Sequence, residues 1–159
     1  TRYGTVTGVQ TCALPISGAG LVSVSGAISD AGRLTLVDST GATFNGAVTA
    51  QTLQITSTNT GTVAFNNDLT VAGTLSAAAS TYALSIVGGL NTIGGPVSFL
   101  NTGALTIGDN DSDSTDIQSG VSRALQTNLQ GVVSFGGGAT LGSVNATSKG
   151  GLQIGRAHV

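Results

Sequence analysis

The 159-residue sequence contains no methionine, no tryptophan and no glutamate, and it has only one cysteine and one histidine. The long side chains that favour helices are therefore nearly absent, which disfavours an α-helical protein. Only five residues are basic, against seven that are acidic, so the chain lacks the electrostatic footprint of a nucleic-acid-binding or anionic-membrane-binding protein. Without a methionine there is no start codon, and we expect a fragment of a longer protein.

Both ends of the sequence resemble translated sequencing-library adapter. Residues 6–16 read VTGVQTCALPI, which is one reading frame of a common short-read adapter. The reverse complement of the same DNA encodes IGRAHV, the last six residues. We therefore expect residues 1–16 and 154–159 to be adapter-derived and residues 17–153 to be the biological part. On this interpretation Cys12 and His158 carry no chemistry.

The middle of the chain alternates apolar and small polar residues. Such alternation places the apolar pair of each triplet on one face of a strand. Glycine, asparagine and serine separate the triplets at roughly ten-residue intervals, which predicts an all-β protein of short strands. The triplets are Val22-Ser23-Val24, Leu34-Thr35-Leu36, Leu53-Gln54-Ile55, Leu69-Thr70-Val71, Leu84-Ser85-Ile86 and Leu105-Thr106-Ile107.

Residues 69–108 carry no charge, but this stretch contains several glycines, many hydroxyl side chains and Pro96. Buried strands with neutral turns are therefore expected here, and no membrane insertion.

All four phenylalanines lie in one local pattern, in which glycine precedes and asparagine or glycine follows. The instances are GATFNG, GTVAFNN, GPVSFLN and GVVSFGG, and the phenylalanines are 21, 34 and 36 residues apart. Small aliphatic residues stack well on copies of themselves, which favours a parallel β-helix, or β-solenoid, of six or seven coils with about 20 residues per coil. The asparagines after the phenylalanines, Asn45, Asn66 and Asn101, either form a side-chain ladder or only tolerate the turn geometry.

The repeats resemble those of bacterial surface adhesins built from β-strand repeats. The likeness lies in the FNG and FNN motifs, in the LTL, LTV and LTI strands, and in stretches such as GATFNGAVTAQTLQIT and GTVAFNNDLTVAGTL. Passengers of autotransporters and filamentous-haemagglutinin-like exoproteins are the nearest families, and the likeness covers about residues 20–145. It implies a β-helix shaft, export to the cell surface or the medium, and a host or surface ligand bound outside this fragment. The segment LTIGDNDSDSTD is also similar to phage tail-fibre and surface-layer repeats.

The acidic segment 109–116 is the one candidate metal site. Carboxylates occur here at alternate positions, as they do in calcium-binding loops. The candidate ligands are Asp109, Asp111 and Asp113. The glycine and glutamate that an EF-hand loop needs are replaced by Ser114 and Gly120. The alternative is a solvated loop in which aspartate and serine cap turns.

We expect no enzymatic activity and no cofactor other than this calcium ion. Glycoside hydrolysis by a β-helix enzyme requires two carboxylates at a set separation. The acidic residues outside the loop, Asp30, Asp38 and Asp68, lie at turn-like positions without a cluster of basic residues beside them. A non-catalytic part of a carbohydrate-active enzyme remains an alternative to the adhesin shaft. Exposed strand edges at both ends of a cut solenoid predict self-association.

Overall fold

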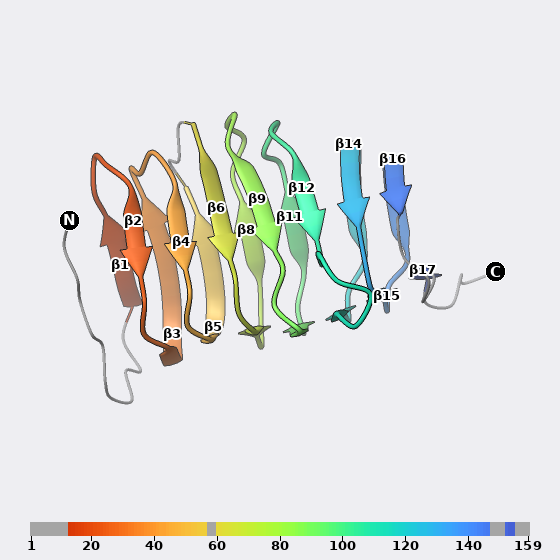
Figure 1. Cartoon of the computed structure of the whole chain (residues 1–159), viewed down its shortest axis with the longest axis horizontal. Helices are drawn as coiled ribbons and strands as arrows, with labels where there is room; N and C mark the ends of the chain where they lie inside the picture. The colour runs from red at the N-terminus through yellow and green to blue at the C-terminus, as the bar shows by residue number, and fades with distance from the viewer. Residues whose placement is uncertain (1–12, 57–59, 147–151, 155–159) are drawn as a thin grey trace.

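The computed structural model describes residues 13–56, 60–146 and 152–154. Every regular element within these ranges is a β-strand, and the strands pair in parallel. They wind about six times around one long axis, so that the two sheets run the length of the molecule (Figure 1). The predicted all-β parallel β-solenoid is confirmed.

Most of the strands are short. The described residues form β1 (Ala13–Ser17), β2 (Val22–Val24), β3 (Ile28–Val37), β4 (Ala42–Phe44), β5 (Val48–Ile55), β6 (Thr62–Phe65), β7 (Leu69–Val71), β8 (Leu75–Ala77), β9 (Ala83–Ile86), β10 (Leu90–Ile93), β11 (Val97–Phe99), β12 (Leu105–Ile107), β13 (Ser114–Ile117), β14 (Val121–Leu129), β15 (Val132–Phe135), β16 (Ala139–Ala146) and β17 (Leu152–Ile154). Each of the six predicted triplets lies within one of them.

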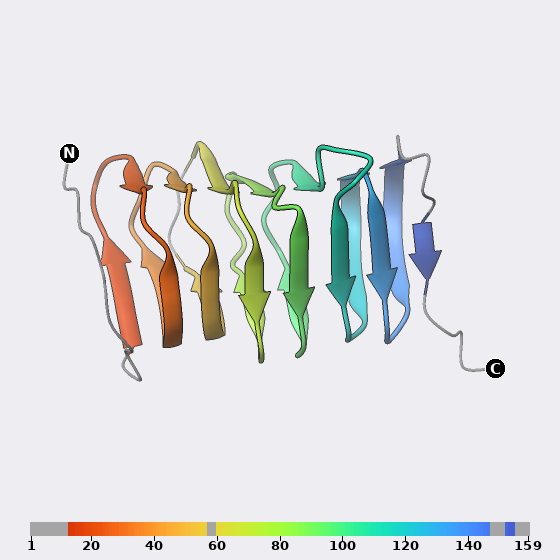
Figure 2. The same ribbon diagram turned by 60° about the horizontal axis from the view of Figure 1, so that its bottom comes forward.

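Strand β5 shows that a coil has three faces. Residues 48–50 of β5 pair with β7, whereas residues 53–55 pair with β8. The third face is a separate sheet, in which β6 lies between β4 and β9. Face A is the face that contains β7, β10, β13 and β15, and face B contains β8 and β11. Face C contains β4, β6, β9 and β12. Figure 2 shows the strands of successive coils side by side.

The core consists of aliphatic columns that run along the axis. On face B, Leu53 and Ile55 are buried while Gln54 between them is only partly buried, as the alternation predicts. Ile55 has Leu36 as its ladder partner in the preceding coil and Ala77 in the following one. Each fully buried aliphatic side chain contributes roughly 1.5–3 kcal/mol before the loss of chain entropy is subtracted. The columns therefore hold consecutive coils together.

Tight corners bring backbone onto backbone. A Cβ atom at Gly46 would collide with the carbonyl carbon of Gly26, one coil earlier. At the same corner the side chain of Asn66 donates a 2.9 Å hydrogen bond to Oδ1 of Asn45. The asparagine ladder is thus confirmed for Asn45 and Asn66. Asn101 is not part of it, because that residue is buried beside another coil corner.

The phenylalanine pattern does not mark one column. Phe44 and Phe65 are ladder partners on face C, and their rings stack with centroids 4.8 Å apart. Phe99 is on face B and Phe135 on face A. The reason is coil length: 21 residues make one coil, whereas spacings of 34 and 36 residues end part-way around the next one.

The predicted adapter segments fall mostly outside the described residues. The described exceptions are residues 13–16 and Ile154. Residues 13–16 belong to β1, whose neighbour is β3, and Ile154 is the ladder partner of Phe135. The adapter origin of both ends stays a prediction.

Candidate functional site

A buried arginine interrupts the aliphatic column of face B. The inward positions of this face hold Leu36, Ile55, Ala77 and Phe99 in successive coils. In the next coil the inward position belongs to Arg123 of β14, which is only 3% exposed. Its ladder partner on the far side is Leu141 of β16. A charged side chain therefore occupies a position that burial otherwise reserves for apolar groups.

The guanidinium group of Arg123 is held by the backbone that leaves β11. Nη1 donates to the carbonyl oxygen of Asn101 at 2.7 Å, to Oδ1 of the same residue at 3.1 Å, and to the carbonyl oxygen of Phe99 at 3.3 Å. Nη2 donates to the carbonyl oxygen of Gly103 at 2.7 Å. Arg123 thereby fixes the loop that carries the chain from face B to face C.

Two further buried side chains complete this cluster. Asn101 is fully buried, and its side-chain amide donates to the carbonyl oxygen of Tyr82 at 3.2 Å. Tyr82 is also fully buried, at the same corner one coil earlier, and its hydroxyl has no hydrogen-bond partner. Burial raises the pKa of Tyr82, and the nearby positive charge of Arg123 offsets part of that rise. Burial lowers the pKa of the Arg123 guanidinium, and Tyr82 acts in the opposite direction.

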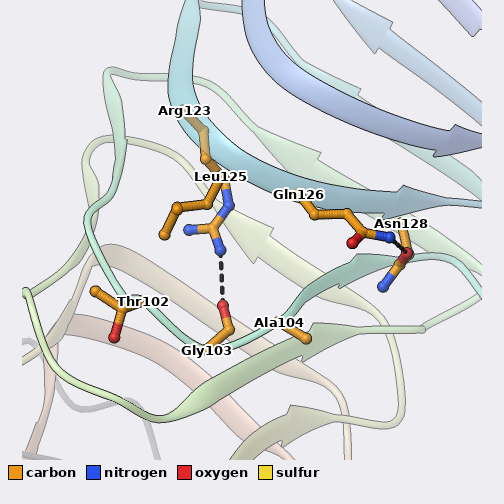
Figure 3. Close-up of a pocket in the computed structure, with 7 residues that line it drawn as sticks. All are labelled: Thr102, Gly103, Ala104, Arg123, Leu125, Gln126 and Asn128. Carbon is orange, nitrogen blue, oxygen red and sulfur yellow. Dashed lines mark hydrogen bonds between the residues drawn. The ribbon is translucent and has the colours of Figure 1, made fainter.

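A pocket of about 340 Å³ opens beside Arg123 at the corner between faces B and C (Figure 3). Its walls come from two coils: the loop after β11 on one side and β14 on the other. Strand β14 is irregular here, since its register with β16 shifts between Arg123 and Gln126. The lining residues are Thr102, Gly103, Ala104, Arg123, Leu125, Gln126 and Asn128.

The acidic loop is arranged as a backbone cap. Asp113 is buried, and its Oδ2 accepts hydrogen bonds from the backbone amides of Asp109 at 2.8 Å and Asn110 at 2.9 Å. Asp109 and Asp111 are exposed, and Oδ1 of Asp111 accepts a 3.3 Å hydrogen bond from Gln130. Desolvation, followed by the negative charge of Asp113 and a side-chain hydrogen bond to it, raises the pKa of Asp109.

Of the three predicted calcium ligands, the structure brings Asp109 and Asp113 together. Over the residues that it describes, no three acidic, histidine or cysteine side chains form a group that could hold a metal ion. The carboxylate of Asp113 is already engaged with backbone amides, as the alternative of a turn-capping loop predicts. A calcium site stays a prediction that a titration can test. Asp68, another turn residue, accepts a hydrogen bond from the backbone of Leu90 at 2.9 Å.

A second polar pair lies inside face A. Asn91 is fully buried and is the ladder partner of Thr115, to whose hydroxyl it donates a 3.0 Å hydrogen bond. Its Oδ1 accepts from the backbone amide of Leu69 at 3.0 Å, and its amide also donates to the carbonyl oxygen of Gly88. All of these bonds are internal, so this pair joins three coils and is structural.

The Arg123 cluster was not predicted from the sequence. The signal that was present is the triplet Val121-Ser122-Arg123, which has the alternation of the other strands with arginine at its second inward position. Asn101 was considered only as a ladder or turn residue, and its role as an acceptor for Arg123 depends on a contact across 22 residues.

No protein-family model, no curated protein sequence and no solved structure matches this chain. Among the described residues there is also no helix with the length and apolar character needed to cross a bilayer. Evidence on function therefore comes from the molecule's own geometry.

Proposed function

We propose that the chain is a structural shaft segment of a secreted or cell-surface bacterial adhesin. One observation carries this proposal: about six coils stack on one axis, with columns of aliphatic side chains running through consecutive coils. Each coil adds about 4.8 Å to the length of such a rod. A stack of this kind extends a distal binding region away from a surface and needs no ligand contact of its own.

The way that the polar groups are used supports a mechanical role. Asn91, Asn101 and Asp113 are buried; the two asparagines form hydrogen bonds to neighbouring coils, and Asp113 holds its own loop. Buried polar groups that are satisfied in this way specify register and rigidity. We therefore propose that the segment is not an enzyme, that it functions outside the cell, and that the parent's main ligand binds elsewhere.

The first experiment recovers the DNA that flanks codons 41–107 in the source sample by long-read sequencing. Further solenoid coils, an export signal and a secretion domain are expected on either side of residues 17–153. Genes for virion proteins beside them would contradict the adhesin and favour a fibre. Reads that continue through the codons for residues 1–16 and 154–159 as genomic sequence would refute the adapter origin of the ends.

The second experiment tests the shaft role in the parent protein. Deleting residues 69–90 removes one whole coil, because the next strand of face A, β10, then takes the place of β7. The variant should fold, bind the parent's ligand unchanged and be shorter by about 4.8 Å in small-angle scattering. Deleting residues 69–79 is the matched control, since half a coil moves every later strand to a wrong face and should prevent folding. Loss of ligand binding in the folded whole-coil variant would contradict the proposal.

A further inference from the structure

The positive charge of Arg123 has no anionic partner among the described residues, since the only charge interaction acting on it comes from Tyr82. All of its acceptors are neutral oxygens. Moving a charge from water into a protein without an opposite charge is unfavourable. An anion that reached this guanidinium would therefore gain both Coulomb energy and charge-assisted hydrogen bonds.

Arg123 also has hydrogen-bond donors to spare. A guanidinium group carries five N–H donors. Nη1 is fully engaged with Phe99 and Asn101, and Nη2 uses one of its two hydrogens on Gly103. Nε is buried and has no partner. The N–H of Nε and one N–H of Nη2 lie on the same edge of a guanidinium group, where they form the fork that a carboxylate binds through both oxygens.

Arg123 lines a pocket that has the character of a saccharide site. Its volume of about 340 Å³ suits one sugar ring, since small-molecule pockets begin at about 300 Å³. Leu125, 43% exposed, offers an apolar wall. The amides of Gln126 and Asn128 lie on the other side, joined by a 3.4 Å hydrogen bond (Figure 3). Amides that keep free donors and acceptors at a pocket wall suit the hydroxyl groups of a sugar.

We propose that the pocket between the loop after β11 and strand β14 binds a carboxylate-bearing saccharide, such as a uronic acid unit of an acidic polysaccharide. The carboxylate is held by the free edge of Arg123, the ring packs on Leu125, and ring hydroxyls contact Gln126 and Asn128. This function is additional to the shaft role and does not depend on it. It gives the side of the rod a contact with acidic glycans.

The test follows the Nε–H resonance of Arg123 by NMR in the full chain, because a direct ligand of this group must move that signal. The sequence contains four arginines, so assignment by the Arg33→Lys variant and the other single substitutions is practical. The titrants are galacturonate, acetate and galactose. Galacturonate is expected to move the signal saturably at millimolar concentration, and galactose is expected to leave it unmoved.

The blocking variant is Ala104→Leu, which fills the pocket from an exposed position and leaves the Arg123 hydrogen bonds intact. It should weaken galacturonate binding about tenfold or more, the loss of one charge-assisted hydrogen bond. The matched control is Ala79→Leu, an exposed alanine outside the pocket lining, which should bind as the unmodified chain does. Arg123→Lys keeps the charge and removes the fork, and it should also weaken binding.

Equal responses to acetate and galacturonate would overturn the saccharide assignment, because the carboxylate alone would then account for the binding. No response to galacturonate, an equal response to galactose, or full binding by Ala104→Leu would each overturn the proposal. Because Ala104→Leu leaves the buried cluster untouched, the test stands even if Arg123→Lys does not fold.

Discussion

The stacked pair Phe44 and Phe65 gives the sharpest test of how consecutive coils hold together. Both rings are buried, they lie 4.8 Å apart, and the angle between their planes is 5°. An aromatic pair of this kind contributes about 0.5–1.5 kcal/mol beyond the area that it buries. Replacing Phe65 with leucine should lose this term together with about 1–1.5 kcal/mol of packing. We therefore expect the free energy of unfolding to fall by about 1.5–3 kcal/mol.

Phe135→Leu is the matched control, because Phe135 is equally buried and its ladder partner in the preceding coil is Ile117, which has no ring. This variant should lose only the packing term, about 1–1.5 kcal/mol. Urea unfolding followed by far-UV circular dichroism measures both variants. The dependence of the unfolding free energy on urea must stay unchanged, because a solenoid can lose cooperativity between coils.

A double-mutant cycle isolates the stack. Phe44→Leu, Phe65→Leu and the double variant should give a coupling energy of about 0.5–1.5 kcal/mol. A coupling near zero, or a Phe135→Leu variant that is as destabilised as Phe65→Leu, would refute the claim that ring stacking between coils adds to burial.

Four further changes test other parts of the fold. Gly46→Ala should destabilise the chain by about 1–3 kcal/mol through overpacking, whereas Gly26→Ala, with open space around its Cβ position, should be nearly neutral in the same urea assay. Asn91→Ala should lower the free energy of unfolding by about 1–3 kcal/mol, because the buried backbone amide of Leu69 loses its acceptor. An unchanged midpoint of urea unfolding would contradict this. Tyr82→Phe should raise the free energy of unfolding by about 1 kcal/mol, because the buried hydroxyl of Tyr82 has no hydrogen-bond partner. A lower melting temperature of the variant would show that the hydroxyl is hydrogen-bonded. Folding raises the pKa of Asp109, so the contribution of this group to stability is present below its unfolded pKa and is lost as pH rises through the folded pKa. Asp109→Asn should therefore be more stable than the unmodified chain at neutral pH, by about 0.5 kcal/mol or less because the group is exposed. Melting curves recorded in acid should show no difference between the two proteins.

Alternation with period two was sufficient to locate six of the strands among the described residues. Triplets such as Leu53-Gln54-Ile55 put two apolar side chains on the same side of any extended chain, whatever the rest of the protein does. The glycines and asparagines between them marked the corners, and Asn45 and Asn66 do form a ladder there. The predicted coil of about 20 residues, a common repeat size for such folds, agrees with the 18 to 24 residues that separate ladder partners on face A.

The assignment of strands to faces did not follow from alternation. Ladder partners on face A are separated by 24 residues from Asn91 to Thr115, but by only 18 residues from Thr115 to Val133. Corner loops absorb these differences, and their length fixes which strand lies on which face. Phe99 and Phe135, which share a local pattern with Phe44, therefore lie on other faces of the solenoid.

The candidate site shows the same division between local and tertiary information. The sequence by itself determined that the chain forms short parallel strands with aliphatic interiors, because burial and strand geometry act over a few residues. Only the tertiary structure decided that Arg123 points inward and that Asn101 and Tyr82 lie beside the arginine. These contacts join residues about 20 to 40 positions apart in the sequence, and the register between coils brings them together.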